Sequence, residues 1–140
     1  MTCLPDLNVW IALAVGEHTH HVPARGWLDN FDERVVFCRV TQMGLLRLLT
    51  NRHVLRGDAF SPDRAWASYE KFMDDSRISR VEEPAGLDRH WRASTMQERQ
   101  GSNWWTDTYL AAFADAAGFT LVTFDVQLAS RRNVSTRLLR

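Results

Sequence analysis

Short apolar runs alternate with longer amphipathic stretches along the 140 residues. Apolar runs that end at polar residues or turns are typical of buried strands, and apolar residues spaced i, i+3, i+4 predict helices. The pattern predicts strands over residues 2–5, 35–38, 78–81, 119–123 and 133–138. It predicts helices over residues 7–15, 23–31, 42–51, 62–73, 87–96, 106–118 and 126–131, with Asn8 and Thr41 as candidate caps of the first and third.

This order of strands and helices predicts the fold class. Alternating strands and helices form parallel sheets with helices on both faces, connected by right-handed crossovers. We therefore expect an α/β fold, a three-layer α/β/α arrangement around a central parallel sheet of about four to five strands. A hydrophobic fraction of 45% and a charged fraction of 24% are ordinary for a globular domain of this length, so one domain over residues 1–140 is expected.

Composition excludes some classes of protein and adds little about partners. No apolar run approaches the roughly 20 residues of a membrane span, and the first residues lack a secretory signal pattern, so we expect a cytoplasmic protein without a membrane segment. The formal net charge is +0, which gives no general indication of a nucleic-acid partner. Cys3 and Cys38 stand in apolar surroundings without metal-ligand spacing, which predicts buried, reduced thiols.

Three aspartates stand where the predicted strands and helices reverse direction. Asp6 and Asp125 follow the first and fourth strands, and Asp107 begins the helix that leads into the fourth. Each alone is typical of a helix cap or a first helical turn. In an open parallel sheet, however, ligands bind beyond the carboxyl ends of the strands, where the strand order reverses. Three carboxylates at such a crevice repel one another unless a cation joins them, and an all-oxygen ligand set favours Mg²⁺ or Mn²⁺. The chemistry indicated is phosphodiester hydrolysis.

Two other acids and two tryptophans lie near Asp107 in the sequence. Asp115 lies eight positions after Asp107 on the same helix, about 12 Å along its axis at ~1.5 Å per residue, which is too far to share a metal ion. Glu98 lies in a polar segment and is a weak additional candidate. Trp104 and Trp105 are placed to stack on bases, but packing of at least one of them in the core is the favoured interpretation.

Four short motifs stand at these predicted strand ends and helix starts. They are Asp6-x-Asn8, Thr41-Gln42-x-Gly44, Trp105-Thr106-Asp107-x-Tyr109-Leu110-Ala111 and Thr123-Phe124-Asp125. Together they span essentially the whole chain, and they resemble the motifs of PIN-domain ribonucleases, especially the VapC toxins of bacterial toxin-antitoxin pairs.

The resemblance implies a single PIN-like nuclease domain that is dimeric, depends on Mg²⁺ or Mn²⁺ and cleaves RNA. It also implies inhibition by a VapB-type antitoxin, whose C-terminal segment wraps the toxin and reaches the acidic site, and binding of operator DNA only through that antitoxin. The implied metal ligands are Asp6, Asp107 and Asp125, which together with Gln42 form the catalytic set. The residues expected to support them are Asn8, Thr41 and Thr106.

Gln42 departs from the family pattern, because many relatives have glutamate at this position. The amide removes a negative charge but keeps a neutral carbonyl oxygen. An alternative is therefore a catalytically weakened PIN domain that acts mainly as a binding partner in an antitoxin and operator complex. A phosphatase or phosphotransfer domain is disfavoured, since Asn8 stands where a haloacid-type phosphatase needs a second aspartate and no Gly-x-x-x-x-Gly-Lys loop is present.

Overall fold

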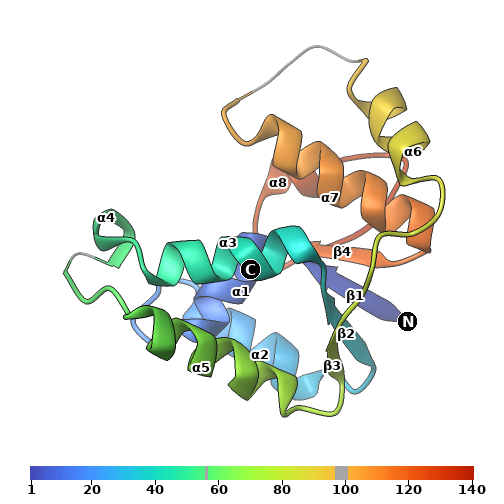
Figure 1. Ribbon diagram of the computed structural model, residues 1–140. Coiled ribbons are helices and arrows are strands. Elements are labelled where there is room, and N and C mark those ends of the chain that lie inside the picture. The colour runs from blue at the N-terminus through green and yellow to red at the C-terminus, as the bar shows by residue number, and fades with distance from the viewer. Residues whose placement is uncertain (56, 97–100) are drawn as a thin grey trace.

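A five-stranded parallel sheet forms the centre of the computed structural model, which describes residues 1–55, 57–96 and 101–140 (Figure 1). The strand order is β3-β2-β1-β4-β5, and every neighbouring pair is parallel. The strands are β1 (Thr2–Pro5), β2 (Arg34–Phe37), β3 (Ile78–Arg80), β4 (Thr120–Thr123) and β5 (Ser135–Leu138). The predicted parallel sheet is confirmed.

Helices cover both faces of this sheet, as the sequence predicts (Figure 1). One face carries α1 (Leu7–Ala14), α2 (His21–Asn30), α3 (Arg39–Leu49) and α5 (Pro62–Met73), and the other carries α6 (Leu87–Ser94) and α7 (Trp104–Ala117). Two short helices, α4 (Arg52–Leu55) and α8 (Val126–Ala129), complete the described elements. The sequence pattern did not predict α4, which is a single turn. In the described parts of the chain, no helix has both the length and the apolar character needed to cross a membrane.

Each face of the sheet has its own hydrophobic core, because successive side chains of a strand point to opposite faces. In β2, Val35 and Phe37 join the core under α1 and α5, whereas Val36, with Cys38 just after the strand, joins the core under α7. Trp10 of α1 stacks on Phe37 with ring centroids 3.7 Å apart. Cys3 and Cys38 are both buried free thiols, as predicted.

The caps or first residues of three helices differ from those predicted. Asp6, rather than the exposed Asn8, caps α1 by accepting a hydrogen bond from the backbone N–H of Val9. Helix α3 begins at Arg39, with Cys38 as its cap, so Thr41 lies inside the first turn. There the Thr41 hydroxyl accepts a hydrogen bond from the Cys38 N–H in a capping box. Helix α7 begins at Trp104, so Thr106 and Asp107 lie within its first turn instead of opening it.

Arg77, just before β3, connects the amino-terminal edge of the sheet with the end of α2. Its Nη1 donates to the backbone carbonyl of Leu28 at 2.6 Å and to that of Phe31, at the end of α2. Its Nε and Nη2 donate to the carboxylate of Asp75 at 3.0 and 2.6 Å. This interaction holds the pKa of Asp75 at about 2, below its usual value of 3.8. Polar contacts of Arg77 with Asp75, Leu28 and Phe31 therefore stabilise the sheet edge opposite the predicted site.

The strand order reverses between β1 and β4. The chain passes from β1 outward to β2 and β3, and then returns to place β4 on the other side of β1. The carboxyl ends of β1 and β4 consequently border the crevice where ligands bind in such sheets. Gly44 permits α3 to pack closely on the start of α1, because a Cβ atom at this position would lie 2.7 Å from Cδ2 of Leu7.

Candidate active site

Asp6 follows β1 directly and is almost fully buried, with 5% of its surface exposed. Its carboxylate accepts hydrogen bonds from the Val9 N–H, at 3.1 Å, and from the Thr123 hydroxyl. Burial above all, together with the charges of Asp107 and Asp125, raises the pKa of Asp6 to about 6, although the two hydrogen bonds oppose this rise. Asp6 is thus a buried acid held next to other acids.

Thr123 connects Asp6 with Asp125. Its hydroxyl donates to Oδ2 of Asp6 and accepts the backbone N–H of Asp125 at 2.9 Å. Asp125 is exposed and caps α8, where its Oδ1 accepts the N–H of Gln127 at 2.8 Å. Thr123 was not among the predicted site residues. A threonine two positions before an acid at a strand end is typical of a side-chain turn, and that signal was present in the sequence.

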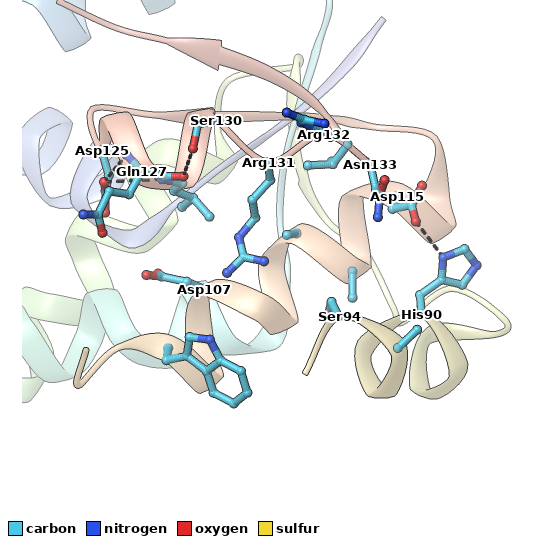
Figure 2. Close-up of a pocket in the computed structure, with 16 residues that line it drawn as sticks. His90, Ser94, Asp107, Asp115, Asp125, Gln127, Ser130, Arg131, Arg132 and Asn133 are labelled. Carbon is cyan, nitrogen blue, oxygen red and sulfur yellow. Dashed lines mark hydrogen bonds and ion pairs between the residues drawn. The ribbon is translucent and has the colours of Figure 1, made fainter. Parts of the chain in front are cut away.

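Asp107 reaches the same edge from α7 and is half-buried. Burial raises the pKa of Asp107, the charge of Asp125 raises it further, and the nearby guanidinium of Arg131 lowers it. Asp107 and Asp125 both line one pocket, which is shown in Figure 2. The structure therefore brings the three predicted aspartates to the carboxyl edge of β1 and β4.

Gln42 is also buried, with 6% of its surface exposed, in the first turns of α3 after β2. Its carbonyl oxygen accepts a hydrogen bond from Nη1 of Arg39 at 2.6 Å. The sequence did not single out Arg39, although positions three apart on a helix are neighbours. Because Arg39 engages the carbonyl oxygen, Gln42 is less available as a neutral metal ligand than the sequence suggested.

The remaining predicted residues lie around this cluster or apart from it. Asn8 and Thr106 are exposed, and the hydroxyl of Thr41 is used within the capping box of α3. Asp115 lies further along α7, where its carboxylate pairs with Nδ1 of His90 at 2.8 Å. Glu98 lies outside the described residues.

The donor chemistry of the cluster fits a hard divalent cation. Asp6, Asp107 and Asp125 offer carboxylate oxygens alone, without thiolate or imidazole, which suits Mg²⁺ or Mn²⁺. Within residues 1–55, 57–96 and 101–140, no three His, Cys, Asp or Glu side chains are arranged to hold a metal ion as they stand. Coordination of one ion by all three aspartates therefore requires side-chain rotation.

Residues 3–133 match the family model described as PIN domain, and the chain belongs to this family. It is 45% identical over 142 residues to Ribonuclease VapC41 of Mycobacterium tuberculosis, with 97% of each sequence covered. It is 33% identical over 132 residues to Ribonuclease VapC29 of the same organism, covering 92% of this chain and 90% of that protein.

Solved structures of lower identity share the fold. A VapBC2 complex from Rickettsia felis, bound to a DNA fragment from its promoter, superposes with a TM-score of 0.71 at 14% identity, over 100% of both chains. The Sarcin-Ricin loop cleaving toxin VapC20 of Mycobacterium tuberculosis superposes with a TM-score of 0.68 at 17% identity, over 94% of this chain and 98% of that chain.

Proposed function

We propose that this protein is a metal-dependent endoribonuclease, a single PIN-like nuclease domain that acts as the toxin of a toxin-antitoxin pair. The observation that carries the proposal is the link made by Thr123 between Asp6 and Asp125, at the point where the strand order reverses and with Asp107 on the same edge. The 45% identity to a protein named as a ribonuclease, over nearly the whole chain, supports the same activity.

In this proposal Asp6, Asp107 and Asp125 hold the ion, and Gln42, buried near the start of α3, completes the catalytic set. When bound, Mg²⁺ or Mn²⁺ would lower the pKa of the attacking water and neutralise charge that develops on the phosphate. The protein's own contribution is positioning. The Thr123 hydroxyl and the Val9 N–H fix the orientation of the Asp6 carboxylate, and the helix cap prevents this side chain from turning to solvent.

The partners follow from the same family membership. We propose an RNA substrate, a VapB-type antitoxin, a homodimer in the cytoplasm, and operator DNA bound only through the antitoxin. The support comes from solved structures with this fold, which include a DNA-bound VapBC complex from Salmonella typhimurium.

Removal of the metal ion should abolish cleavage. We expect the purified, antitoxin-free protein to cleave single-stranded RNA with Mg²⁺ or Mn²⁺, to lose this activity in EDTA, and to regain it with excess Mn²⁺. Gel analysis of an end-labelled RNA measures all three, and Asp63→Asn, an exposed change on α5, serves as the control. Absence of cleavage in protein that still binds its antitoxin would favour the binding-only alternative, and cleavage that resists EDTA would exclude the metal.

Restoring the family's glutamate should strengthen metal binding. We expect Gln42→Glu to tighten Mn²⁺ binding several-fold, because a carboxylate adds charge at this buried position, although an ion pair with Arg39 limits the gain. Isothermal titration calorimetry measures the effect. Met43→Glu is the matched control, since it adds the same charge on the exposed side of α3. Equal affinities of Gln42→Glu and the unmodified protein would place this residue outside the metal site.

A further inference from the structure

A pocket of about 580 Å³ extends from the acidic site between α6, α7 and the segment that joins α8 to β5 (Figure 2). Asp107 and Asp125 line one part of it, and the His90–Asp115 pair lines another, further along α7. Pockets that bind small ligands typically enclose roughly 300–1,000 Å³, so this one has room for a nucleotide. It is also continuous with the acidic site, because Asp107 and Asp125 belong to both.

Arg131 enters this pocket between its two acidic parts. The side chain is half-buried, and Figure 2 shows its guanidinium directed into the pocket on the side of Asp107. No ion pair is formed by Arg131 or by the neighbouring, exposed Arg132 with any residue that the structure describes. A half-buried guanidinium without a fixed partner keeps its hydrogen-bond donors available, and its planar geometry matches phosphate.

Small side chains leave the space beside Arg131 open. Ala111 and Ala112 of α7 line the pocket, together with Ala93 of α6, and Leu128 and Val134 add apolar surface from the opposite side. Between the acids at its two ends, the pocket thus combines the arginines Arg131 and Arg132 with apolar surface, as a phosphate joined to a ribose and a base requires. An acidic peptide segment would match only the arginines.

We propose that this pocket binds the RNA strand on one side of the cleaved bond. Arg131 contacts the phosphate of the neighbouring nucleotide, and the surface formed by Ala93, Ala111 and Ala112 accommodates the nucleotide itself. The inference rests on the proposed ribonuclease function, since a strand with its scissile phosphate at Asp107 and Asp125 must continue over an adjacent surface. It assigns a substrate-binding role to Arg131, beyond the aspartates.

Loss of Arg131 should weaken RNA binding in the full-length protein even when cleavage is prevented. The probe is a fluorescein-labelled single-stranded RNA of randomised sequence, measured by anisotropy in EDTA. A randomised probe is suitable because phosphate contacts carry no sequence information. We expect Arg131→Met to weaken binding roughly tenfold, as for loss of one charge-assisted contact. A plot of log affinity against log salt concentration should have a slope less steep by about 0.7.

A second variant tests the pocket without touching its charges. Ala93 is exposed on α6, so Ala93→Phe fills the pocket without crowding the core, and it should weaken RNA binding while leaving the salt dependence unchanged. Arg34→Met is the matched control. Arg34 begins β2 at the opposite edge of the sheet, and its removal should leave RNA binding unchanged. Urea unfolding midpoints verify that all three variants are folded.

The outcomes separate this inference from the proposed function. If the unmodified protein binds RNA, loses affinity in Arg131→Met and Ala93→Phe, but does not cleave RNA with Mg²⁺, the pocket is supported and the nuclease function is wrong. If it cleaves RNA and both variants bind RNA as the unmodified protein does, the pocket proposal is wrong. Loss of antitoxin binding alone in these variants would assign the pocket to a protein partner and also overturn the proposal.

Discussion

Asp6→Asn is expected to lower the rate of RNA cleavage by roughly 10²–10⁴-fold, because a metal-bound transition state is stabilised by several kcal/mol and each ~1.4 kcal/mol corresponds to a factor of ten. Asparagine caps helices about as well as aspartate, so the start of α1 should be retained. The change therefore removes the buried charge while keeping the shape of the site.

Single-turnover cleavage with Mg²⁺ or Mn²⁺ measures this effect, and Mn²⁺ calorimetry should show weaker binding in the variant. Asp29→Asn is a suitable control, since Asp29 is an exposed residue on α2 that pairs with Arg25. Cleavage by Asp6→Asn at the rate of the unmodified protein would show that the Asp6 carboxylate is not a metal ligand, however close it lies to Asp107 and Asp125.

Arg77→Met is expected to lower the free energy of unfolding by about 2–3 kcal/mol at neutral pH. The change removes donors to the carbonyls of Leu28 and Phe31 and to the Asp75 carboxylate. A hydrogen bond to a charged group has a net contribution of ~1.5–3 kcal/mol, and the partial exposure of Arg77 and Asp75 keeps the expected total near the value for one such bond. Arg77 lies at the amino edge of the sheet, so cleavage by the folded variant should be unchanged.

The loss of stability in Arg77→Met should become smaller as the pH falls. The pKa of Asp75 is lowered to about 2 in the folded protein, from its usual 3.8, so its ion pair stabilises the fold fully above about pH 4. This contribution is lost as the pH falls through about 2. The difference in stability between the unmodified protein and Arg77→Met should therefore shrink between pH 4 and pH 2.

Urea unfolding at several pH values measures the difference, with Arg34→Met as control. Arg34 is also an arginine near this edge, but it is exposed, and among the described residues its guanidinium makes one long hydrogen bond, of 3.4 Å, to the Ser79 hydroxyl. A loss of stability in Arg77→Met that stays constant down to pH 2 would mean that Arg77 stabilises the fold through the carbonyl contacts alone and not through the Asp75 ion pair.

The parallel sheet and the position of the acids were predictable because both depend on local pattern and on a general rule. Short apolar runs end at Asp6 and shortly before Asp125, and parallel strands place their carboxyl ends at one edge. The caps were predicted less well. Cysteine is not a common cap, so the sequence favours Thr41 as the cap of α3, whereas the Thr41 hydroxyl accepts a hydrogen bond from the N–H of the true cap, Cys38.

The contacts that complete the site were harder to predict, since they join residues distant in sequence. Thr123 meets Asp6 across 117 positions, and its role depends on the exact alignment of β1 with β4. The direction of Arg131 depends on the backbone path between α8 and β5, for which the sequence pattern contains no periodic signal. Arg39 with Gln42 is different, because their spacing on one helix made this pair predictable.

Helix α7 carries both Asp107 and, eight positions later, Asp115, so one rigid element spans the pocket from the acidic site to the His90–Asp115 pair. A helix changes length far less readily than a loop, and the separation of these positions is therefore constant at about 12 Å. In the proposed complex, the position of the nucleotide bound beside this helix determines which phosphodiester bond reaches Asp107. Cleavage at a uniform offset from the bound nucleotide would then follow from helix geometry, even where the RNA sequence varies.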